Sequence, residues 1–205
     1  MEYPKIHSLY MRDPITNKFT TEFSKPEFDS EDLWHVEEKI DGMNMRVYID
    51  NGKITDIKGR TDAASIPPKL LKWLGRDELV LKIMEHYNTG PVILFGEGFG
   101  AGIQSGGIYR KDQAMILFDC YMGGRWSTRL EILEIAGQLG MEVPAFIGLM
   151  TKEEAIKYVK SKPKGFYGDQ NYPMEGVMCR SEPLVRYNTR SANPVMFKLK
   201  VKDFK

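Results

Sequence analysis

The chain has 205 residues, of which 42% are hydrophobic and 28% charged, a composition that excludes disordered and fibrous proteins. Its two cysteines are too few for a disulfide framework or a cysteine-rich zinc site, and both lie in apolar runs, which predicts buried thiols in a reducing compartment. The formal net charge is +1, no apolar run could span a bilayer and the first residues lack a signal-peptide pattern, so we expect a soluble cytoplasmic protein.

The first predicted elements in chain order are the two strands of a hairpin. Residues 43–49 alternate apolar and polar side chains, which is the period of a half-buried strand. Asp50-Asn51-Gly52 favours a tight turn, and residues 53–58 then return as the second strand. Two further elements follow: a loop over residues 59–68 and a helical segment over residues 69–87 with a break at Gly75.

The middle of the chain is predicted to contain two buried strands and then two helices. Continuous apolar runs indicate the strands, at residues 91–97 and 113–122, with a glycine-rich loop over 98–112 between them. We expect the first helix to reach about Leu139 and the second to end before Pro163. Each helix begins with a capping-box pattern, Thr128 with Glu131 and Thr151 with Glu154.

Strands are predicted again in the last part of the sequence, at about residues 174–180 and 194–201, after a loop over 164–174. Because strands and helices do not alternate regularly along the chain, we expect an α+β fold with largely antiparallel sheets. No flexible linker and no internal repeat divides the sequence. We therefore expect a single domain over residues 1–205, with no appended C-terminal domain.

The small net charge hides a polarity along the sequence. Residues 1–41 carry five cations and ten anions, whereas residues 176–205 carry seven cations and two anions. A basic C-terminal region is suited to phosphate groups, and therefore to nucleic acid. A solvated charged surface is the commoner reason for such a run.

The first candidate site is Lys39-Ile40-Asp41-Gly42. A lysine that leads into a buried strand is costly to desolvate, and burial favours the neutral amine, which is a nucleophile. The alternative is a surface lysine–aspartate pair beside a turn glycine, and on this motif alone it is the commoner arrangement.

Four further candidates follow along the chain, each with an ordinary structural alternative. Glu97, at the end of a predicted strand, can bind a ligand or be a loop acid, and Phe118 can stack on a base or belong to the core. Glu175 opens a strand, where an edge acid is the ordinary interpretation. Lys198 and Lys200 share one face of a strand, and their repulsion suggests an anionic ligand such as a triphosphate unless they protect a sheet edge.

In sequence order the motifs run Lys-x-Asp-Gly, Gly-Arg, Glu-Gly, Phe-Asp, Glu-Gly and Lys-x-Lys. This set resembles the covalent nucleotidyltransferase superfamily, which contains ATP-dependent DNA and RNA ligases and mRNA-capping guanylyltransferases. The RNA-ligase-2-type branch is the most similar, because its lysine motif extends to Lys-x-x-Gly-x-Asn, here Lys39 to Asn44. Gly59-Arg60-Thr61 lies where that branch has its next motif, and Gly96-Glu97 with Gly102-Ile103-Gln104 is similar to its third motif and the loop after it.

The resemblance implies a nucleotidyltransferase domain of two mainly antiparallel sheets flanked by helices, with the nucleotide in the cleft between them. It implies that ATP is the AMP donor and that Mg²⁺ or Mn²⁺ is required. Lys39 would attack the α-phosphate to form a lysyl-adenylate, and the AMP would pass to the 5′-phosphate of a polynucleotide. A 3′-hydroxyl would then displace the AMP. RNA is the favoured polynucleotide, which suggests a part in RNA repair.

The resemblance also implies roles for the other motif residues. Lys198 and Lys200 would hold the α-phosphate and orient pyrophosphate, and Glu175 would bind the metal ion or its waters. Glu97 would hydrogen-bond the ribose hydroxyls and Phe118 would stack on adenine. The remaining residues are Arg60 and Asn44, at the 5′-phosphate end or at a nucleotide phosphate; Arg180, at a phosphate; and Asp41, which would orient Lys39 or water.

Two other enzymes of this superfamily stay open as alternatives, and so do two kinds of protein that would not seal a strand by themselves. A minimal DNA ligase is possible because DNA ligases share Lys-x-Asp-Gly, whereas RNA-ligase-2-type enzymes often have histidine where Asp41 stands. A capping guanylyltransferase would use GTP. Only five residues follow Lys200, so an isolated adenylylation domain stays open as well. The alternative of a different class is a module of the same fold that binds nucleic acid without catalysis.

Overall fold

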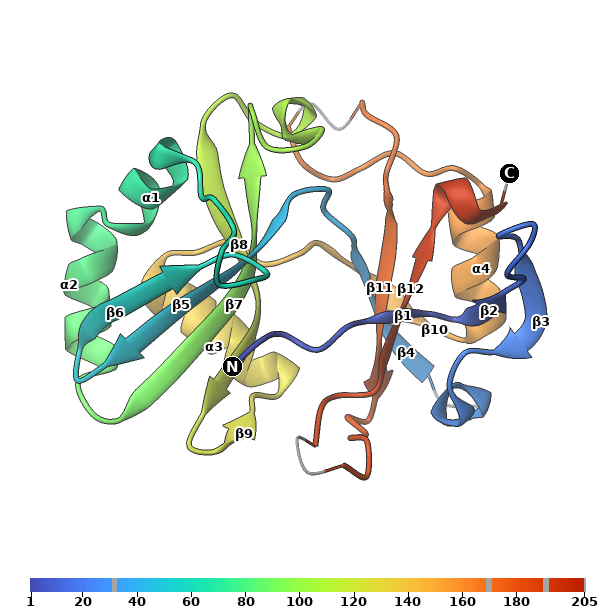
Figure 1. Ribbon diagram of the computed structural model, residues 1–205, viewed down its shortest axis with the longest axis horizontal. Coiled ribbons are helices and arrows are strands. Elements are labelled where there is room, and N and C mark those ends of the chain that lie inside the picture. The colour runs from blue at the N-terminus through green and yellow to red at the C-terminus, as the bar shows by residue number, and fades with distance from the viewer. Residues whose placement is uncertain (31–32, 169–170, 190–191, 205) are drawn as a thin grey trace. The chain divides into compact units, whose positions relative to one another are not determined.

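A computed structural model describes residues 1–30, 33–168, 171–189 and 192–204 (Figure 1). The chain forms two compact units, and neither is a single continuous stretch of sequence. Unit 1 consists of Met1–Tyr3 and Asp41–Pro144, and unit 2 consists of Pro4–Ile40 and Ala145–Lys205.

Unit 1 is built on one antiparallel sheet with the strand order β6-β5-β7-β8-β9. Three helices pack on this sheet, and a short 3-10 helix lies in the loop between β7 and β8. The strands are β5 (Met43–Asp50), β6 (Lys53–Lys58), β7 (Pro91–Gly100), β8 (Gln113–Met122) and β9 (Arg125–Trp126). The helices are α1 (Pro68–Leu74), α2 (Asp77–His86), the 3-10 helix η2 (Gly106–Ile108) and α3 (Arg129–Leu139).

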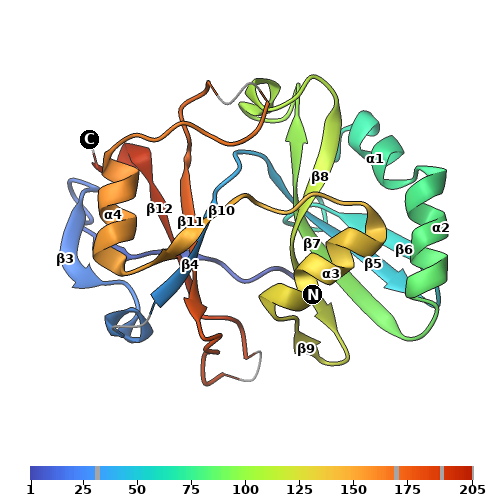
Figure 2. The same cartoon turned by 180° about the vertical axis from the view of Figure 1, so that it is seen from behind.

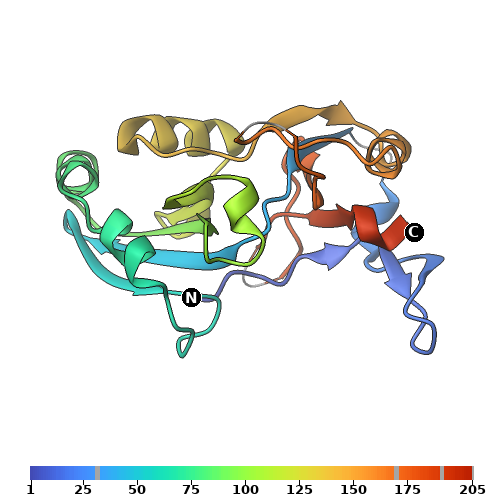
Figure 3. The same ribbon diagram turned by 90° about the horizontal axis from the view of Figure 1, so that it is seen from above.

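The alternation along β5 decides which face of this sheet is covered. Met45, Val47 and Ile49 are at most 1% exposed and belong to a core that also contains apolar residues of α1, α2 and α3. Figures 2 and 3 show α3 lying across this side of the sheet. The intervening residues, Asn44 and Arg46 among them, point to the opposite face because successive strand residues alternate sides. The opposite face therefore carries the polar side chains of β5.

Unit 2 is built on a second sheet with the order β1-β12-β11-β4-β10. Its pairings are antiparallel except that β1 runs parallel to β12. The strands are β1 (His7–Ser8), β4 (Leu33–Glu38), β10 (Phe146–Met150), β11 (Gly176–Glu182) and β12 (Met196–Lys200), with a separate hairpin of β2 (Tyr10–Arg12) and β3 (Phe19–Phe23). The helices are α4 (Lys152–Lys160) and the 3-10 helices η1 (Pro26–Asp29) and η3 (Val201–Phe204).

The helix α4 covers one face of the sheet in unit 2. Ala155 and Val159 of α4 are fully buried with Val177 and Cys179 of β11 and other apolar residues of the neighbouring strands. Successive residues of a strand point to opposite faces, and Val177 and Cys179 face α4, so residues 176, 178 and 180 lie on the other face. The ladder between β11 and β12 places Lys198 opposite Met178 and Lys200 opposite Gly176, so both lysines lie on that other face as well.

The predicted α+β class with mainly antiparallel sheets is confirmed. The turn of the first hairpin has positive φ at Asn51 and Gly52, the helical segment breaks at Gly75 into α1 and α2, and both capping boxes are present. Both cysteines are buried as expected. The prediction of a loop from residue 98 is wrong at its start, because β7 continues to Gly100. None of the helices within the described ranges is long and apolar enough to cross a membrane.

Candidate active site

Lys39 follows directly after β4 in unit 2. Its backbone N–H donates to Gly176 O at 2.9 Å, which continues the pairing of β4 with β11 by one residue. Its side chain is 19% exposed, and Nζ donates to Glu175 Oε2 at 2.8 Å and to Ile40 O at 3.3 Å. The predicted nucleophile therefore lies directly after a strand and pairs with the carboxylate of Glu175. The surface pair of Lys39 with Asp41, which the motif alone also allowed, is not formed among the described contacts.

Glu175 joins two of the predicted lysines. Its Oε2 accepts from Lys39 and its Oε1 lies 2.5 Å from Lys200 Nζ, with all three side chains less than a quarter exposed. Glu175 O accepts from Val201 N at 3.0 Å, which fixes its backbone. A Cβ at Gly176 would lie 2.0 Å from Leu199 O, so only glycine permits this close approach of β11 to β12. The cluster has two cations and one anion, and such a cluster favours an anionic ligand.

Lys198 and Arg180 lie on the same face of the sheet as this cluster. Lys198 is two residues before Lys200 on β12, and Arg180 is on β11, opposite His35 of β4. Arg180 is only 4% exposed. All five predicted site residues of unit 2, namely Lys39, Glu175, Arg180, Lys198 and Lys200, are thus on or beside three adjacent strands, and three of them are in direct contact.

A buried carboxylate stands beside Lys39 that sequence reasoning did not identify. Glu38 is 1% exposed, and it accepts from Tyr172 Oη at 2.7 Å and from Phe166 N at 2.8 Å. Burial raises the pKa of Glu38 above its ordinary value, although both hydrogen bonds oppose this effect. Glu38 thereby ties the segment that leads to Glu175 to the end of β4. The Glu-Glu pair before Lys39 was the only sequence signal for it.

In unit 1, Asn44 and Glu97 are directly opposite each other on β5 and β7. Asn44 Oδ1 is buried and accepts no hydrogen bond from the described residues. A Cβ at Gly42 would lie 2.3 Å from Gly98 O and 2.9 Å from Glu97 Cγ, so the lysine motif passes close to β7. A buried acceptor without a protein donor, beside a carboxylate, suits a ligand that brings its own donor.

Asp41 does not contact Lys39 through any described hydrogen bond or ion pair, and its backbone is held instead. Asp41 N donates to Tyr109 Oη at 3.0 Å, and the Tyr109 ring is 4% exposed and 6.0 Å from the ring of Phe99. Tyr109 belongs to the glycine-rich loop, and its role was not foreseen because tyrosine in such a loop carries no pattern of its own. The loop therefore supports the lysine motif.

Phe118 lies on β8 where the register with β7 shifts between Phe95 and Gly96. It is half-buried, and its ring centroid is 4.9 Å from that of Tyr3 in an edge-to-face arrangement. Tyr3 Oη also donates to Asp119 Oδ2 at 2.9 Å. Phe118 is thus outside the apolar core of the sheet, as a stacking residue requires, and the N-terminal segment packs against it.

Arg60 is exposed and lies in the loop after β6. The loop itself is attached to the sheet through Arg46 of β5, a residue that the alternating pattern marks only as one polar position of a strand. Asn44, Arg60, Glu97 and Phe118, the four predicted site residues of unit 1, all lie outside its apolar core. Within the described part of the chain, no three histidine, cysteine, aspartate or glutamate side chains are grouped to hold a metal ion.

Comparison with known proteins identifies the family. A family model described as RNA ligase matches residues 32–200. Among solved structures, a Naegleria gruberi RNA ligase variant with ATP and Mn has a TM-score of 0.63 at 19% identity, covering 98% of this chain and 64% of that one. Naegleria gruberi RNA ligase with PPi has a TM-score of 0.63 at 20% identity, covering 97% of this chain and 61% of that one.

A third structure, another Naegleria gruberi variant with AMP and Mn, has a TM-score of 0.64 at 18% identity and covers 96% of this chain and 61% of that one. Likeness at this identity establishes the fold. The chain spans about three fifths of the length of these solved proteins. The comparison with curated protein sequences found no match.

Proposed function

Because the chain belongs to the RNA ligase family, we propose that it is an ATP-dependent RNA ligase with Lys39 as its nucleophile. Lys39 would take AMP from ATP and pass it to the 5′-phosphate of an RNA strand, and a 3′-hydroxyl would then displace the AMP. The observation that carries this proposal is the contact of Lys39 with Glu175, which also holds Lys200. The two units together would act as one adenylyltransferase domain.

The first step forms a bond between Lys39 Nζ and the α-phosphorus of ATP. The bond from that phosphorus to the pyrophosphate oxygen breaks, and the amine gives up a proton. Phosphoryl-type transfer needs little from a protein beyond the nucleophile, correct positions and neutralisation of charge. Lys198 and Lys200 would supply positive charge to the α-phosphate and to pyrophosphate, and Arg180 would add to it. Glu175 Oε2, at 2.8 Å from Nζ, is within hydrogen-bond distance of the departing proton.

A divalent cation is part of the proposal. The similar Naegleria gruberi structures contain Mn with ATP or AMP. A site with a single carboxylate, Glu175, suits Mg²⁺ or Mn²⁺, because Mg²⁺ takes most of its ligands from water and from phosphate oxygens. A metal ion held entirely by protein would need more side-chain ligands. Such an ion neutralises phosphate charge.

The residues of unit 1 would bind the nucleotide and the RNA end. Glu97 would accept hydrogen bonds from the ribose hydroxyls, and Phe118 would stack on adenine. Asn44 has an Oδ1 that needs a donor, which a ligand hydroxyl or water would provide, while its Nδ2 would donate to a phosphate. Arg60, exposed on its loop, would contact a phosphate of the nucleotide or of the 5′ end.

The test is transfer of label from α-labelled ATP to the chain in the presence of Mg²⁺, followed by sealing of a 5′-phosphorylated RNA strand. We expect the native chain to become labelled and Lys39→Ala to stay unlabelled. Lys53→Ala is the matched control, because Lys53 is an exposed lysine at the first hairpin turn, and we expect it to label like the native chain.

A native chain that takes up no label, and whose mass shows no AMP already attached, would overturn the proposal. Labelling that survives in Lys39→Ala would overturn the assignment of the nucleophile alone. Substrates that end in RNA or in DNA at the 3′ side separate an RNA ligase from a DNA ligase, since the 2′-hydroxyl is the group by which a protein distinguishes them.

A further inference from the structure

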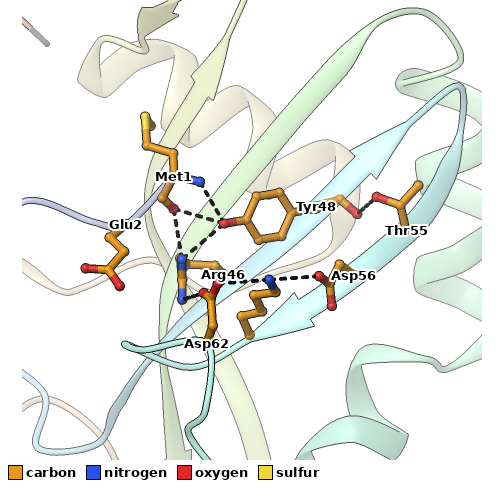
Figure 4. A pocket seen from close by; sticks show the side chains of 8 residues that line it. Met1, Glu2, Arg46, Tyr48, Thr55, Asp56 and Asp62 are labelled. Atoms are coloured by element: carbon orange, nitrogen blue, oxygen red, sulfur yellow. Dashed lines mark hydrogen bonds and ion pairs between the residues drawn. The ribbon is translucent and has the colours of Figure 1, made fainter.

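The loop after β6 contains a turn over residues 59–62, which carries Arg60, and Arg46 binds both ends of this turn. Its Nε donates to Gly59 O at 2.8 Å and its Nη2 donates to Asp62 Oδ1 at 2.8 Å. The Arg46 side chain is 2% exposed, whereas Arg60 between these two anchors is exposed. Figure 4 shows Arg46 and Asp62 in the wall of a pocket of about 530 Å³ beside β5 and β6. One buried guanidinium thus fixes the backbone on either side of an exposed one.

Further contacts restrain the same turn. Lys58 Nζ lies 3.2 Å from Asp62 Oδ2, so Asp62 receives two cations. Arg46, and after it Lys58, hold the pKa of Asp62 below its ordinary value, which keeps this carboxylate charged at neutral pH. Ala64 N donates to Thr61 O at 3.2 Å. The turn is therefore closed on itself as well as attached to the sheet.

The remaining donor of Arg46 contacts the other wall of the pocket. Its Nη1 donates to Met1 O and to Tyr48 Oη, both at 3.1 Å. Burying a charged side chain costs free energy unless its hydrogen bonds are made, and here every nitrogen of the guanidinium has an acceptor. An apolar residue at position 46 would fill a strand at lower cost, but it would leave the turn unattached.

We propose that Arg46 and Asp62 are positioning residues that hold Arg60 in place to bind a phosphate group, either of the nucleotide or of the RNA 5′ end. This inference rests on the proposed function and adds to it the means by which Arg60 is aimed. An arginine on an unrestrained loop loses conformational freedom when it binds, and a loop anchored at both ends has already lost it. A shift of about 1 Å in a positioned group can lower a rate by about 100-fold.

The test compares Asp62→Asn, Arg60→Ala and the double variant. Asp62 is 66% exposed, so its substitution leaves the core intact, which Arg46→Ala does not ensure. One arm measures label transfer from ATP to the chain, and it slows if Arg60 binds a phosphate of the nucleotide. The other arm starts from a chain that already carries AMP and measures transfer of the AMP to 5′-phosphorylated RNA. It slows if Arg60 binds the 5′-phosphate of the RNA. In the arm that Arg60→Ala slows, we expect Asp62→Asn to be slower than native by about 10-fold and the double variant to equal Arg60→Ala.

Asp56→Asn is the matched control. Asp56 also pairs with Lys58, at 3.3 Å, and lines the same pocket, but it makes no described contact with Arg46 or with the turn backbone. We expect native rates in both arms. The inference would be overturned if the rate losses of the two single variants multiplied in the double variant. It would also be overturned if Asp62→Asn kept the same rates as Asp56→Asn.

An Arg60→Ala variant with native rates in both arms would overturn it as well, because the turn would then present no phosphate ligand. In each of these cases the native chain still becomes labelled, so failure of this inference is distinct from failure of the proposed function. Thermal unfolding of every variant is compared with that of the native chain. A loss of rate that came only from lower stability would appear in Asp62→Asn and would appear again, in full, when Asp62→Asn is added to Arg60→Ala.

Discussion

The close approach of Gly42 to β7 makes Gly42→Ala the most informative single substitution. A Cβ at this position would lie 2.3 Å from Gly98 O, about 1.1 Å short of the 3.4 Å at which ordinary contact begins. The atom in the way is a backbone oxygen, which cannot rotate aside as a side chain can. The lysine motif and β7 must therefore separate by about 1 Å. Overpacking of this kind costs about 1–3 kcal/mol of folding free energy.

The expected result for activity is larger than that for stability. Because Gly42 is three residues after Lys39 and its new Cβ would also press on Glu97 Cγ, at 2.9 Å, we expect label transfer from ATP to fall by about 10- to 100-fold. The melting temperature should fall by about 2–10 °C. Single-turnover labelling at several ATP concentrations gives both the rate and the apparent affinity for ATP.

Gly137→Ala is the control for this substitution. Gly137 lies within α3 and a Cβ there would meet no atom within 4 Å, so we expect native labelling and a stability equal to native or up to about 1 kcal/mol higher. A Gly42→Ala chain that labels at the native rate would refute the reasoning, because it would mean that the motif and β7 do not need their present spacing.

Two further outcomes test the residues that support the motif. Tyr109→Phe keeps the ring against Phe99 but removes the acceptor for Asp41 N, so labelling should slow by about 3- to 10-fold with little loss of stability, and an unchanged rate would show that other contacts hold this backbone. Because the pKa of Glu38 is raised above 4.5, the folded chain keeps a proton that the unfolded chain has lost, and stability falls as pH rises above 4.5 until the folded carboxyl ionises. Glu38→Gln should lack this decline in thermal unfolding measured across that range, whereas Glu22→Gln should retain it.

Local patterns predicted the elements whose signals are short-range. The Asp50-Asn51-Gly52 turn needs positive φ at Asn51 and Gly52, which asparagine and glycine accept, and the helix that begins after Thr128 closes at Gly140 with φ of 62°. These features depend on a few neighbouring residues. Their prediction therefore required no knowledge of tertiary contacts.

Elements whose stability comes from distant residues were missed. The strand β4 does not alternate cleanly, because Glu37 and Glu38 are both buried, and Glu38 is accommodated through hydrogen bonds from the distant residues Tyr172 and Phe166. The glycines after Glu97 favour a loop by their type, yet Gly98 lies within β7, where a Cβ would meet Leu70 at 2.5 Å and Met45 at 3.1 Å. In both cases the deciding partner is far along the sequence.

The same distinction holds for the candidate site. The residue types of the motifs were visible in order, but the pairing of Lys39 with Glu175 and Lys200 depends on the register of β4, β11 and β12, which no local pattern gives. The supporting residues Arg46 and Tyr109 belong to no motif. Their roles appear only when the backbone groups that they hold are known.

The discontinuity of the two units bears on how the chain folds as it is synthesised. Most of unit 1 is the uninterrupted stretch 41–144, whose strands pair with near neighbours in sequence, so it can fold as soon as that stretch has left the ribosome. The sheet of unit 2 must instead wait, because β4 pairs with β11 across the whole of that stretch. Lys39 is separated from Glu175 by 136 positions, so the candidate nucleophile can acquire its partners only after residues up to Lys200 have been synthesised. Until then a nascent chain carries its lysine motif without the carboxylate and the second lysine beside it.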